Sequence, residues 1–221
     1  MFSDIEIKGL FGGRYHLKMI YMEQFYLEQP SLKRKQEAIA FINEFLECGS
    51  KINGSGGLNR YLNDYEGWLK KLDQDYHRKP DEEKVPARTY FLIRENDDRI
   101  IGMINIRLSL NEKLRKYGGN IGYCIRLGER GKGYNKINLY LGLKVCEYYG
   151  VDSVLLDADL ENPASWRTME ALGGERIREY FDDEHDHCTV VDYRIDVRKA
   201  LQKHPEYEKY LSEKAKECMN L

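Results

Sequence analysis

Residues Gly119–Asn135, with the sequence GNIGYCIRLGERGKGYN, constrain the fold of this chain more than any other stretch. Ile121, Tyr123 and Ile125 alternate with smaller or polar residues, which is typical of a half-buried strand. Gly128 follows where the backbone must turn. The stretch therefore predicts a strand, a turn and the start of a helix.

The turn itself is rich in glycine, because Gly131 and Gly133 flank Lys132. Without side chains at these positions, several backbone N–H groups can point at one anion where a helix begins, which suits a pyrophosphate. A P-loop is excluded because Lys132 is followed by Gly133 and Tyr134 where the motif needs Ser or Thr directly after the Lys, and a dinucleotide fingerprint is excluded because Lys136 stands where it needs Gly or Ala. The remaining alternative is an ordinary loop whose glycines serve only to turn the backbone.

A helix and a second strand follow the turn. Apolar residues recur at steps of three and four from Tyr134 to Tyr149, and Gly150 ends the helix. The continuous apolar run Val154–Leu156 then predicts a strand covered on both faces. Strand, helix and strand form a right-handed crossover with parallel strands, and a ligand is expected at the carboxyl ends of those strands.

Two blocks of residues carry a resemblance to a known family. The run 130–135, RGKGYN, is similar to the acyl-CoA signature Q/R-x-x-G-x-G/A of the GNAT superfamily of N-acyltransferases, with Asn135 at the last position. The run 162–166, NPASW, followed by Gly173-Gly174, resembles the Asn-led helix of that superfamily. The resemblance covers about residues 88–198 and extends to a bacterial subgroup of predicted acetyltransferases without assigned substrates.

The resemblance implies an α+β, three-layer fold with a mixed, mostly antiparallel sheet, whose central parallel unit splays to hold acyl-CoA. It implies acetyl-CoA as co-substrate. The N–H groups of residues 131–135 would anchor it, with Arg130 and Lys132 as the cations for its phosphates. Backbone N–H groups of strand 123–126 are expected to lose their sheet partners there and to serve the pantetheine arm and the thioester oxygen. The predicted cofactor-binding residues are Cys124, Ile125, Arg126, Arg130, Gly131, Lys132, Gly133, Tyr134, Asn135, Asn162 and Ser165.

The implied reaction moves an acetyl group directly to a primary amine of a small molecule or peptide. The family often protonates the departing thiolate with a tyrosine at the position of Met169, which donates no proton, so Tyr180 or water is left as the source. Asp159 is the candidate base, with a cap on the following loop as the alternative. Cys124 is expected to be a core residue rather than a nucleophile. A non-catalytic acyl-CoA-binding module is the alternative function.

The acceptor side of the cleft is expected to involve a polar row in the predicted strand Arg99–Leu110. Asn105 and Arg107 share one parity of that strand, so they either face the acceptor or are simply solvated. The predicted helix Leu58–Asp75 carries an aromatic stripe that favours core packing, with a lining of the acceptor side as the alternative. That stripe includes Tyr61, Tyr65 and Trp68.

The segment 182–188, DDEHDHC, allows a metal interpretation, because His185 and His187 stand among carboxylates. An exposed acidic hairpin loop produces the same string, and we expect no metal there. By resemblance the loop borders the acceptor pocket, so its acidity would attract a cationic amine.

The remaining predicted elements frame this unit. Ser31 is expected to cap the first helix, and the loop 53–57, NGSGG, is expected to be flexible and to lie over the site. The last helix, at about 205–219, is expected to dock on the domain or on a partner such as a second copy of the chain. The other predicted elements are strands Ile5–Leu10 and Tyr15–Leu27, joined by a hairpin turn at Gly12-Gly13, helix Lys33–Glu47, and strands Thr89–Arg94, Arg176–Phe181 and Thr189–Val197.

Composition limits the class of protein. With 221 residues, of which 42% are hydrophobic and 33% charged, the chain is expected to form one domain over 1–221. A net charge of -2 argues against nucleic-acid binding driven by bulk charge. Five cysteines at wide, irregular spacing indicate reduced thiols in a cytoplasmic protein, and no apolar stretch has membrane-spanning length.

Overall fold

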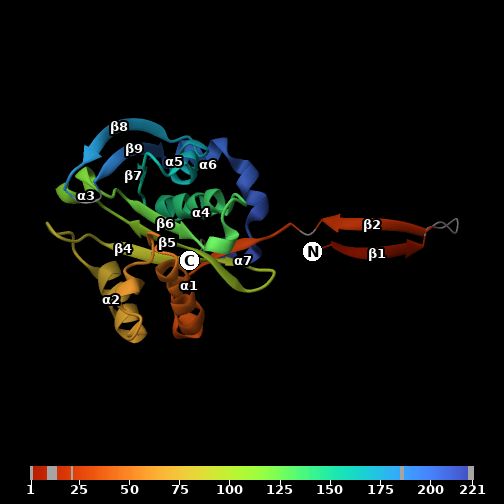
Figure 1. The fold of residues 1–221 in the computed structure, drawn as a ribbon. Helices are drawn as coiled ribbons and strands as arrows, with labels where there is room; N and C mark the ends of the chain where they lie inside the picture. The colour runs from red at the N-terminus through yellow and green to blue at the C-terminus, as the bar shows by residue number, and fades with distance from the viewer. Residues whose placement is uncertain (1, 9–13, 21, 185–186, 219–221) are drawn as a thin grey trace.

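The computed structural model describes residues 2–8, 14–20, 22–184 and 187–218, and its strands form three antiparallel sheets (Figure 1). One sheet has the strand order β3-β4-β5-β6, a second has the order β7-β9-β8, and β1 pairs with β2. The strands are β1 Phe2–Lys8, β2 Arg14–Ile20, β3 Phe25–Glu28, β4 Ala87–Arg94, β5 Arg99–Arg107, β6 Ile121–Ile125, β7 Ser153–Asp159, β8 Glu175–Asp182 and β9 Cys188–Asp196.

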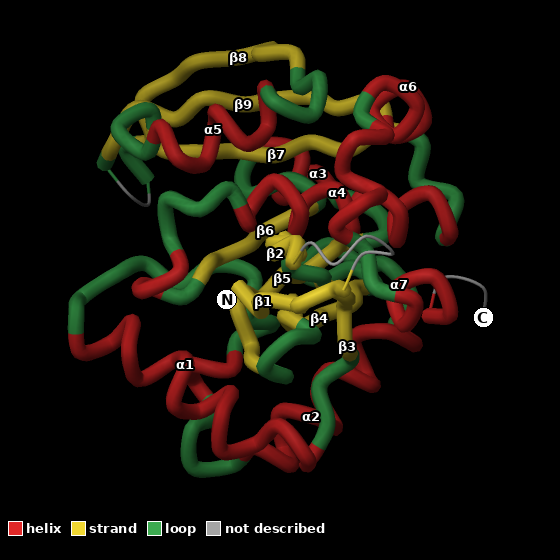
Figure 2. The backbone as a smooth tube through the Cα atoms, turned by 90° about the vertical axis from the view of Figure 1, so that its right-hand side faces the viewer, coloured by secondary structure: helices red, strands yellow, loops and turns green. Residues whose placement is uncertain are grey.

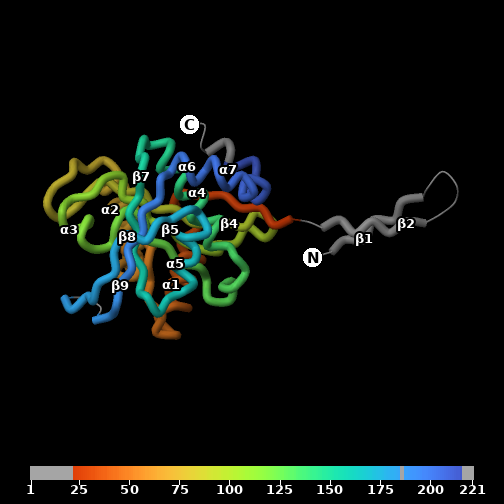
Figure 3. Tube along the Cα trace, turned by 90° about the horizontal axis from the view of Figure 1, so that it is seen from above, coloured from red at the N-terminus to blue at the C-terminus, as the bar shows by residue number. Residues whose placement is uncertain are grey.

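The helices form layers around the two larger sheets. Helices α1 and α2 cover one face of the four-stranded sheet, and α4 packs on its other face, beside α5 and α6 (Figure 2). Figure 3 views the molecule from the side of the three-stranded sheet. The helices are α1 Lys35–Glu47, α2 Tyr65–His77, α3 Glu112–Lys116, α4 Tyr134–Tyr148, α5 Pro163–Glu170, α6 Val197–Lys203 and α7 Glu213–Cys218. In the part of the chain that is described, no helix is long and apolar enough to cross a membrane.

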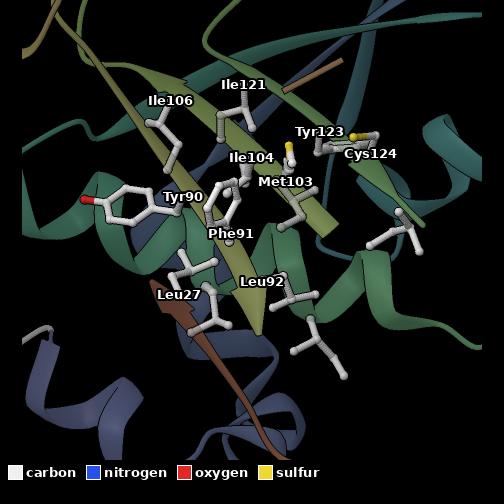
Figure 4. Packing of buried hydrophobic residues seen from close by; sticks show 14 of the residues in the cluster. Leu27, Tyr90, Phe91, Leu92, Met103, Ile104, Ile106, Ile121, Tyr123 and Cys124 are labelled. Carbon is white, nitrogen blue, oxygen red and sulfur yellow. The ribbon is translucent and has the colours of Figure 1, made fainter. Parts of the chain in front are cut away.

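The hydrophobic core lies on both faces of β4 and β5, because helices cover both. Figure 4 shows Phe91, Met103 and Ile104 among its buried side chains. Close packing of α4 on β5 depends on Gly142, since a Cβ added there would lie 2.5 Å from the Cδ1 atom of Ile104. On the other face, the ring of Trp68 from α2 stacks on Phe91. This sandwiched sheet fixes the position of β6 at its edge.

Strands β6 and β7 were predicted to pair in parallel, but they belong to different sheets. They meet where β6 begins, since Asn120 N donates to Leu155 O (2.6 Å) and Leu155 N donates to Asn120 Oδ1 (2.9 Å). The prediction that β7 is covered on both faces is also wrong. Its burial alternates, so that Leu156 is buried while Asp157 and Asp159 are half-buried.

Three predicted boundaries are wrong near the N-terminal half. The expected strand Tyr15–Leu27 is divided between β2 and β3, which lie in different sheets, although the N-terminal hairpin itself is confirmed. Its turn at Gly12-Gly13 lies outside the described residues. The Ser31 side chain does not cap α1, which follows a short 3-10 turn. Helix α2 begins late because Asp64 caps it by accepting a hydrogen bond from Gly67 N (2.9 Å).

The C-terminal segment is not the single helix that was expected over about 205–219. A 3-10 helix, Pro205–Tyr210, is followed by the short helix α7. Between them Leu211 forms an isolated parallel bridge with Phe25, and Ser212 N donates to Phe25 O (3.0 Å). The segment therefore docks on β3, at the edge of the four-stranded sheet of its own chain.

We predict that Leu211→Ala lowers the free energy of unfolding by about 2–5 kcal/mol, because the Leu211 side chain is 2% exposed and its loss leaves a cavity. Leu46→Ala is the control, since Leu46 lies on α1 with 51% exposure and should change stability little. Urea unfolding measures both. Equal losses in the two variants would show that the docked segment does not support the sheet.

Candidate functional site

The divergence of β6 and β7 opens a cavity of about 1870 Å³. Its walls are the loop 50–57, the ends of β5, β6 and β7, the start of α5 and the turn at 129–136. This volume exceeds the roughly 300–1,000 Å³ of common small-molecule pockets. The cavity therefore has room for two ligands that meet in its middle.

The glycine turn opens toward this cavity at the start of α4. Gly131 and Gly133 have φ angles of 78° and 83°, which is the left-handed region that favours glycine. A Cβ added at either residue would meet no protein atom within 4 Å, so the turn presents bare backbone. Because α4 begins at Tyr134, the N–H groups of its first turn point the same way. The predicted anion-binding geometry is thus present.

Backbone alternation decides which N–H groups of β6 face the cavity. Asn120 O accepts from β5 (2.7 Å) and Arg126 N donates to β5 (2.8 Å), so the even-numbered residues of β6 make the hydrogen-bonded pairs. The Cys124 N–H therefore belongs to the β5 ladder and is not free for a ligand, contrary to one of the two expectations. The N–H groups of Tyr123 and Ile125 point away from β5, and among the described residues neither donates to a backbone carbonyl.

Of the basic residues predicted to bind the cofactor, Arg126 and Lys132 do not line the cavity, whereas Arg130 does. Arg126 turns toward α1, where its guanidinium lies 3.2 Å from a Glu44 oxygen, because its parity along β6 is opposite to that of Ile125. Lys132 instead donates to Glu129 Oε2 (2.8 Å). Arg130 remains on the cavity wall.

Arg130 is held in place from two sides. Its Nε donates to Ile125 O (3.2 Å), one NH2 hydrogen goes to Ser50 Oγ (3.0 Å), and its guanidinium lies over the Phe45 ring. The cation is therefore oriented by the protein at the edge of the glycine turn.

Glu129, which precedes the signature, is the centre of a buried ionic network. Its carboxylate accepts from Arg94 (3.1 and 3.2 Å) as well as from Lys132, and Arg94 also bonds Asp97 (2.7 Å). Burial alone would raise the pKa of Glu129, but hydrogen bonds from Lys132 and Arg94 lower that pKa below its usual value. The network ties the turn to the loop between β4 and β5.

The two last residues of the signature are placed differently. The Tyr134 hydroxyl donates to Glu23 and its ring packs on Phe25, so the side chain is held against β3, although the residue also lines the cavity. Asn135 lines the cavity, and its amide nitrogen donates to Thr168 Oγ1 (3.4 Å). The Asn135 Oδ1 atom is buried without a hydrogen-bond partner among the described residues, which leaves an acceptor for a ligand.

The start of α5 brings the second block of the signature to the cavity. Asn162 precedes α5, yet its side chain makes no capping hydrogen bond and is left for other contacts. Ser165 Oγ lies 3.1 Å from the Tyr123 hydroxyl, which also donates to Ser165 O (3.3 Å). Burial raises the pKa of Tyr123, so this phenol keeps its proton at neutral pH. Tyr123 thus joins β6 to α5 at the middle of the cavity.

The candidate proton-transfer residues have unequal positions. Asp159 lines the cavity, and its Oδ1 accepts from Glu161 N (2.9 Å), which is the capping bond that was the alternative interpretation. Its Oδ2 lies 4.0 Å from Lys51 Nζ. Met169 is buried in the core and lies outside the cavity wall. Tyr180 lines the cavity. Burial, and to a smaller extent the negative charge of Asp192, raise the pKa of its phenol to about 12.

Cys124 has the properties of a core residue. Burial raises the pKa of its thiol to about 12, so little thiolate exists at neutral pH. This agrees with the expectation from the sequence.

The acceptor half of the cavity contains both residues of the predicted polar row. Asn105 donates to Thr89 Oγ1 (2.9 Å), and Arg107 donates through one nitrogen to the carbonyls of Gly118 and Gly119 (both 2.7 Å). Of the aromatic stripe, Tyr61 lines the cavity, whereas Tyr65 and Trp68 are core residues. The core-packing interpretation therefore holds for Tyr65 and Trp68 but not for Tyr61.

The glycine-rich loop 53–57 lies over the site, as expected, but it is anchored. A Cβ on Gly54 would lie 2.5 Å from Gly122 O, which shows how closely the loop packs on β6. Gly56 O accepts from Trp68 Nε1 (3.1 Å) and Lys71 Nζ (2.8 Å). These contacts make the loop a fixed wall of the cavity.

The metal interpretation of the acidic hairpin is left without a test. His185 lies outside the described residues, whereas His187 is exposed. Across the ranges that the structure describes, no group of three or more His, Cys, Asp or Glu side chains could hold a metal ion.

Two cavity residues were missed by sequence reasoning. Asp157 lines the cavity two residues before Asp159, and Tyr123 lines it from β6. The alternation of Asp157 and Asp159 in SVLLDAD was a signal for a strand with one polar face. Tyr123 gave no such signal, because a tyrosine in a strand is as common in a hydrophobic core as on a cavity wall.

Comparisons with known proteins agree with this geometry. Residues 52–175 match the family described as acetyltransferase (GNAT) domain. No curated protein matches the chain. Among solved structures, the fold resembles spermidine/spermine N-acetyltransferase SpeG from Vibrio cholerae, with a TM-score of 0.57, 13% identity, and coverage of 81% of this chain and 98% of that one.

Two further structures share the fold. Mycobacterium smegmatis RimJ in complex with CoA-disulfide has a TM-score of 0.59 and 12% identity, over 83% of this chain and 93% of that one. A putative acetyltransferase from Acinetobacter baylyi ADP1 has a TM-score of 0.56 and 14% identity, over 80% and 94%. With more than half of its length matched to the family and this fold around an open glycine turn, the chain belongs to the GNAT acetyltransferases.

Proposed function

We propose that this protein is a cytoplasmic, single-domain enzyme that moves an acetyl group from acetyl-CoA directly to a primary amine of a small molecule or peptide. The observation that carries the proposal is the cavity between β6 and β7, which has the bare glycine turn at one end and the unpaired Ile125 N–H in its wall. Both features suit an acyl-CoA thioester. The amine specificity of the SpeG neighbour is consistent with such an acceptor.

The residues that would hold acetyl-CoA follow from their positions. Backbone N–H groups of residues 131–135 would take the diphosphate, with the oriented guanidinium of Arg130 beside them. The Asn162 side chain, which caps nothing, and the Asn135 Oδ1 atom would meet the pantetheine amides. The Ile125 N–H would donate to the thioester oxygen and to the negative charge that develops there.

Proton transfer needs a base for the ammonium and a donor for the thiolate. Asp159 is our candidate base, since its Oδ2 atom is not used by the loop cap. Tyr123 and Tyr180 both line the cavity, and both keep their protons at neutral pH because burial raises the pKa of each phenol. Either tyrosine would supply the proton that Met169 cannot.

We predict that Gly133→Ala abolishes the thermal stabilisation by acetyl-CoA, because its methyl group would project where the diphosphate meets the backbone. Gly150→Ala is a matched control at the other end of α4. Gly150 also has a positive φ, 71°, and open space around a Cβ, but lies off the cavity. Each variant should lose about 1–2 kcal/mol of stability to strain. A full acetyl-CoA shift in folded Gly133→Ala would remove the turn from the binding site.

We predict that Asp159→Asn lowers kcat by roughly a hundredfold or more while acetyl-CoA affinity and melting temperature stay similar. Asparagine keeps the Oδ1 acceptor for Glu161 N, so the loop cap survives and only the base is lost. Thiol release with an active amine measures the rate. An unchanged rate would limit Asp159 to its capping role, and firm acetyl-CoA binding without turnover on any amine would favour the non-catalytic binding module.

We predict that iodoacetamide at neutral pH modifies Cys48 much faster than Cys124 or Cys146. Cys48 is exposed, whereas the two others are buried with thiol pKa values raised to about 12. Peptide mass spectrometry of the native protein gives the three rates. Fast modification of Cys124 that CoA blocks would indicate an activated thiol and a covalent acyl intermediate.

A further inference from the structure

The acceptor half of the cavity contains an arginine whose charge is poorly compensated. Arg107, at the end of β5, is held by one nitrogen on the carbonyls of Gly118 and Gly119. Its side chain lines the cavity, and burial lowers the pKa of the guanidinium below its usual value. An arginine nevertheless stays charged in proteins and has five N–H donors to satisfy. Most of those donors are left for the cavity.

Arg107 is half-buried, whereas the three arginines that are buried among the described residues are paired with carboxylates. Arg34 lies 2.9 Å from Glu28 and 2.6 Å from Asp98, Arg94 lies 2.7 Å from Asp97 and 3.1 Å from Glu129, and Arg126 lies 3.2 Å from Glu44: each has carboxylates beside it. Within the described ranges, no carboxylate lies within 4.0 Å of Arg107. Asp157 raises its pKa only through space. Arg107 therefore differs from these three arginines in having no carboxylate in contact with it among the described residues.

A half-buried cation without a counter-ion in contact with it favours a site in which a ligand supplies the negative charge. The two backbone carbonyls explain the position of the guanidinium but not its charge, because a neutral amide could hold them as well. The planar fork of arginine matches a carboxylate, with which it forms two parallel hydrogen bonds.

We propose that Arg107 binds a carboxylate of the acceptor, so that the acceptor is a small amino carboxylate rather than a simple amine or polyamine. This inference rests on the proposed transferase function of the same cavity. Asp157, Asp159 and Asp182 also line the cavity, and their carboxylates would attract the amine end of such a molecule. Arg107 and these aspartates together select a zwitterion and orient its amine toward the thioester.

The test compares amino acids with their carboxamides, which keep the shape and the amine but lose the negative charge. Wild-type protein is mixed with acetyl-CoA and a panel of α- and ω-amino acids, each beside its carboxamide and its decarboxylated amine, and thiol release is recorded. We expect kcat/KM for the best amino acid to exceed that of both analogues by about a hundredfold. Equal or better rates with the carboxamide or the decarboxylated amine overturn the proposal.

A binding measurement keeps the test independent of turnover. In the presence of CoA, the amino acid should raise the melting temperature and its carboxamide should not. If no amino acid binds although acetyl-CoA does, the carboxylate proposal fails and the cofactor site stands. If acetyl-CoA gives no shift while an amino acid binds, the transferase proposal fails instead.

Two variants connect the preference to Arg107. Arg107→Gln keeps donors for the carbonyls of Gly118 and Gly119 but removes the charge, so the preference for the acid over the amide should fall to within a few fold. Arg107→Lys keeps the charge but loses the planar guanidinium, so it should retain part of the preference for the acid. Both variants should keep the acetyl-CoA shift, because Arg107 is remote from the glycine turn in the cavity wall. A preference that survives Arg107→Gln unchanged would assign the carboxylate to another residue.

Discussion

Asn120 joins the two larger sheets where β6 begins, and the cavity depends on that contact. Its backbone and side chain exchange hydrogen bonds with Leu155 (2.6 and 2.9 Å), while its O and Nδ2 atoms bond to Arg107 on β5 (2.7 and 3.0 Å). The residue is buried, so these bonds are shielded from water. Beyond this point β6 and β7 separate. The Ile125 N–H consequently has no strand to bond to and remains free for a ligand.

The glycine turn depends on a second constraint, the ionic network around Glu129. Lys132 and Arg94 both bond this buried carboxylate, so the turn is connected to the loop between β4 and β5. Lys132 is therefore largely neutralised by the protein. The attraction for an anion then comes from backbone N–H groups and from Arg130, which packs on the edge of the turn without a carboxylate partner among the described residues. Under the proposed function, such a site would hold a diphosphate by geometry more than by net charge.

The sequence predicted the parts of the fold that repeat a local pattern. The spacing from Tyr134 to Gly150 matched α4 closely, because an amphipathic helix with a glycine at its end is specified by its own residues. The C-terminal segment was misjudged because Leu211 leaves the helical pattern to pair with Phe25, a contact between residues far apart in the chain. The splaying of β6 from β7 was expected only from the family resemblance, because no local pattern in the sequence shows the bonds of Asn120 that decide it.

The site residues were likewise predictable where local sequence decides their position, and not where contacts between distant residues decide it. The open backbone at Gly131 and Gly133 was predictable, whereas the loss of Arg126 to α1 required the parity of β6 relative to β5. The position of Met169 is the instructive case. Because its side chain is buried in the core, the missing tyrosine is not replaced by any group at that position. In the proposed reaction a phenol on the cavity wall would supply the proton instead, either Tyr180 or Tyr123, which lies at the junction of β6 and α5.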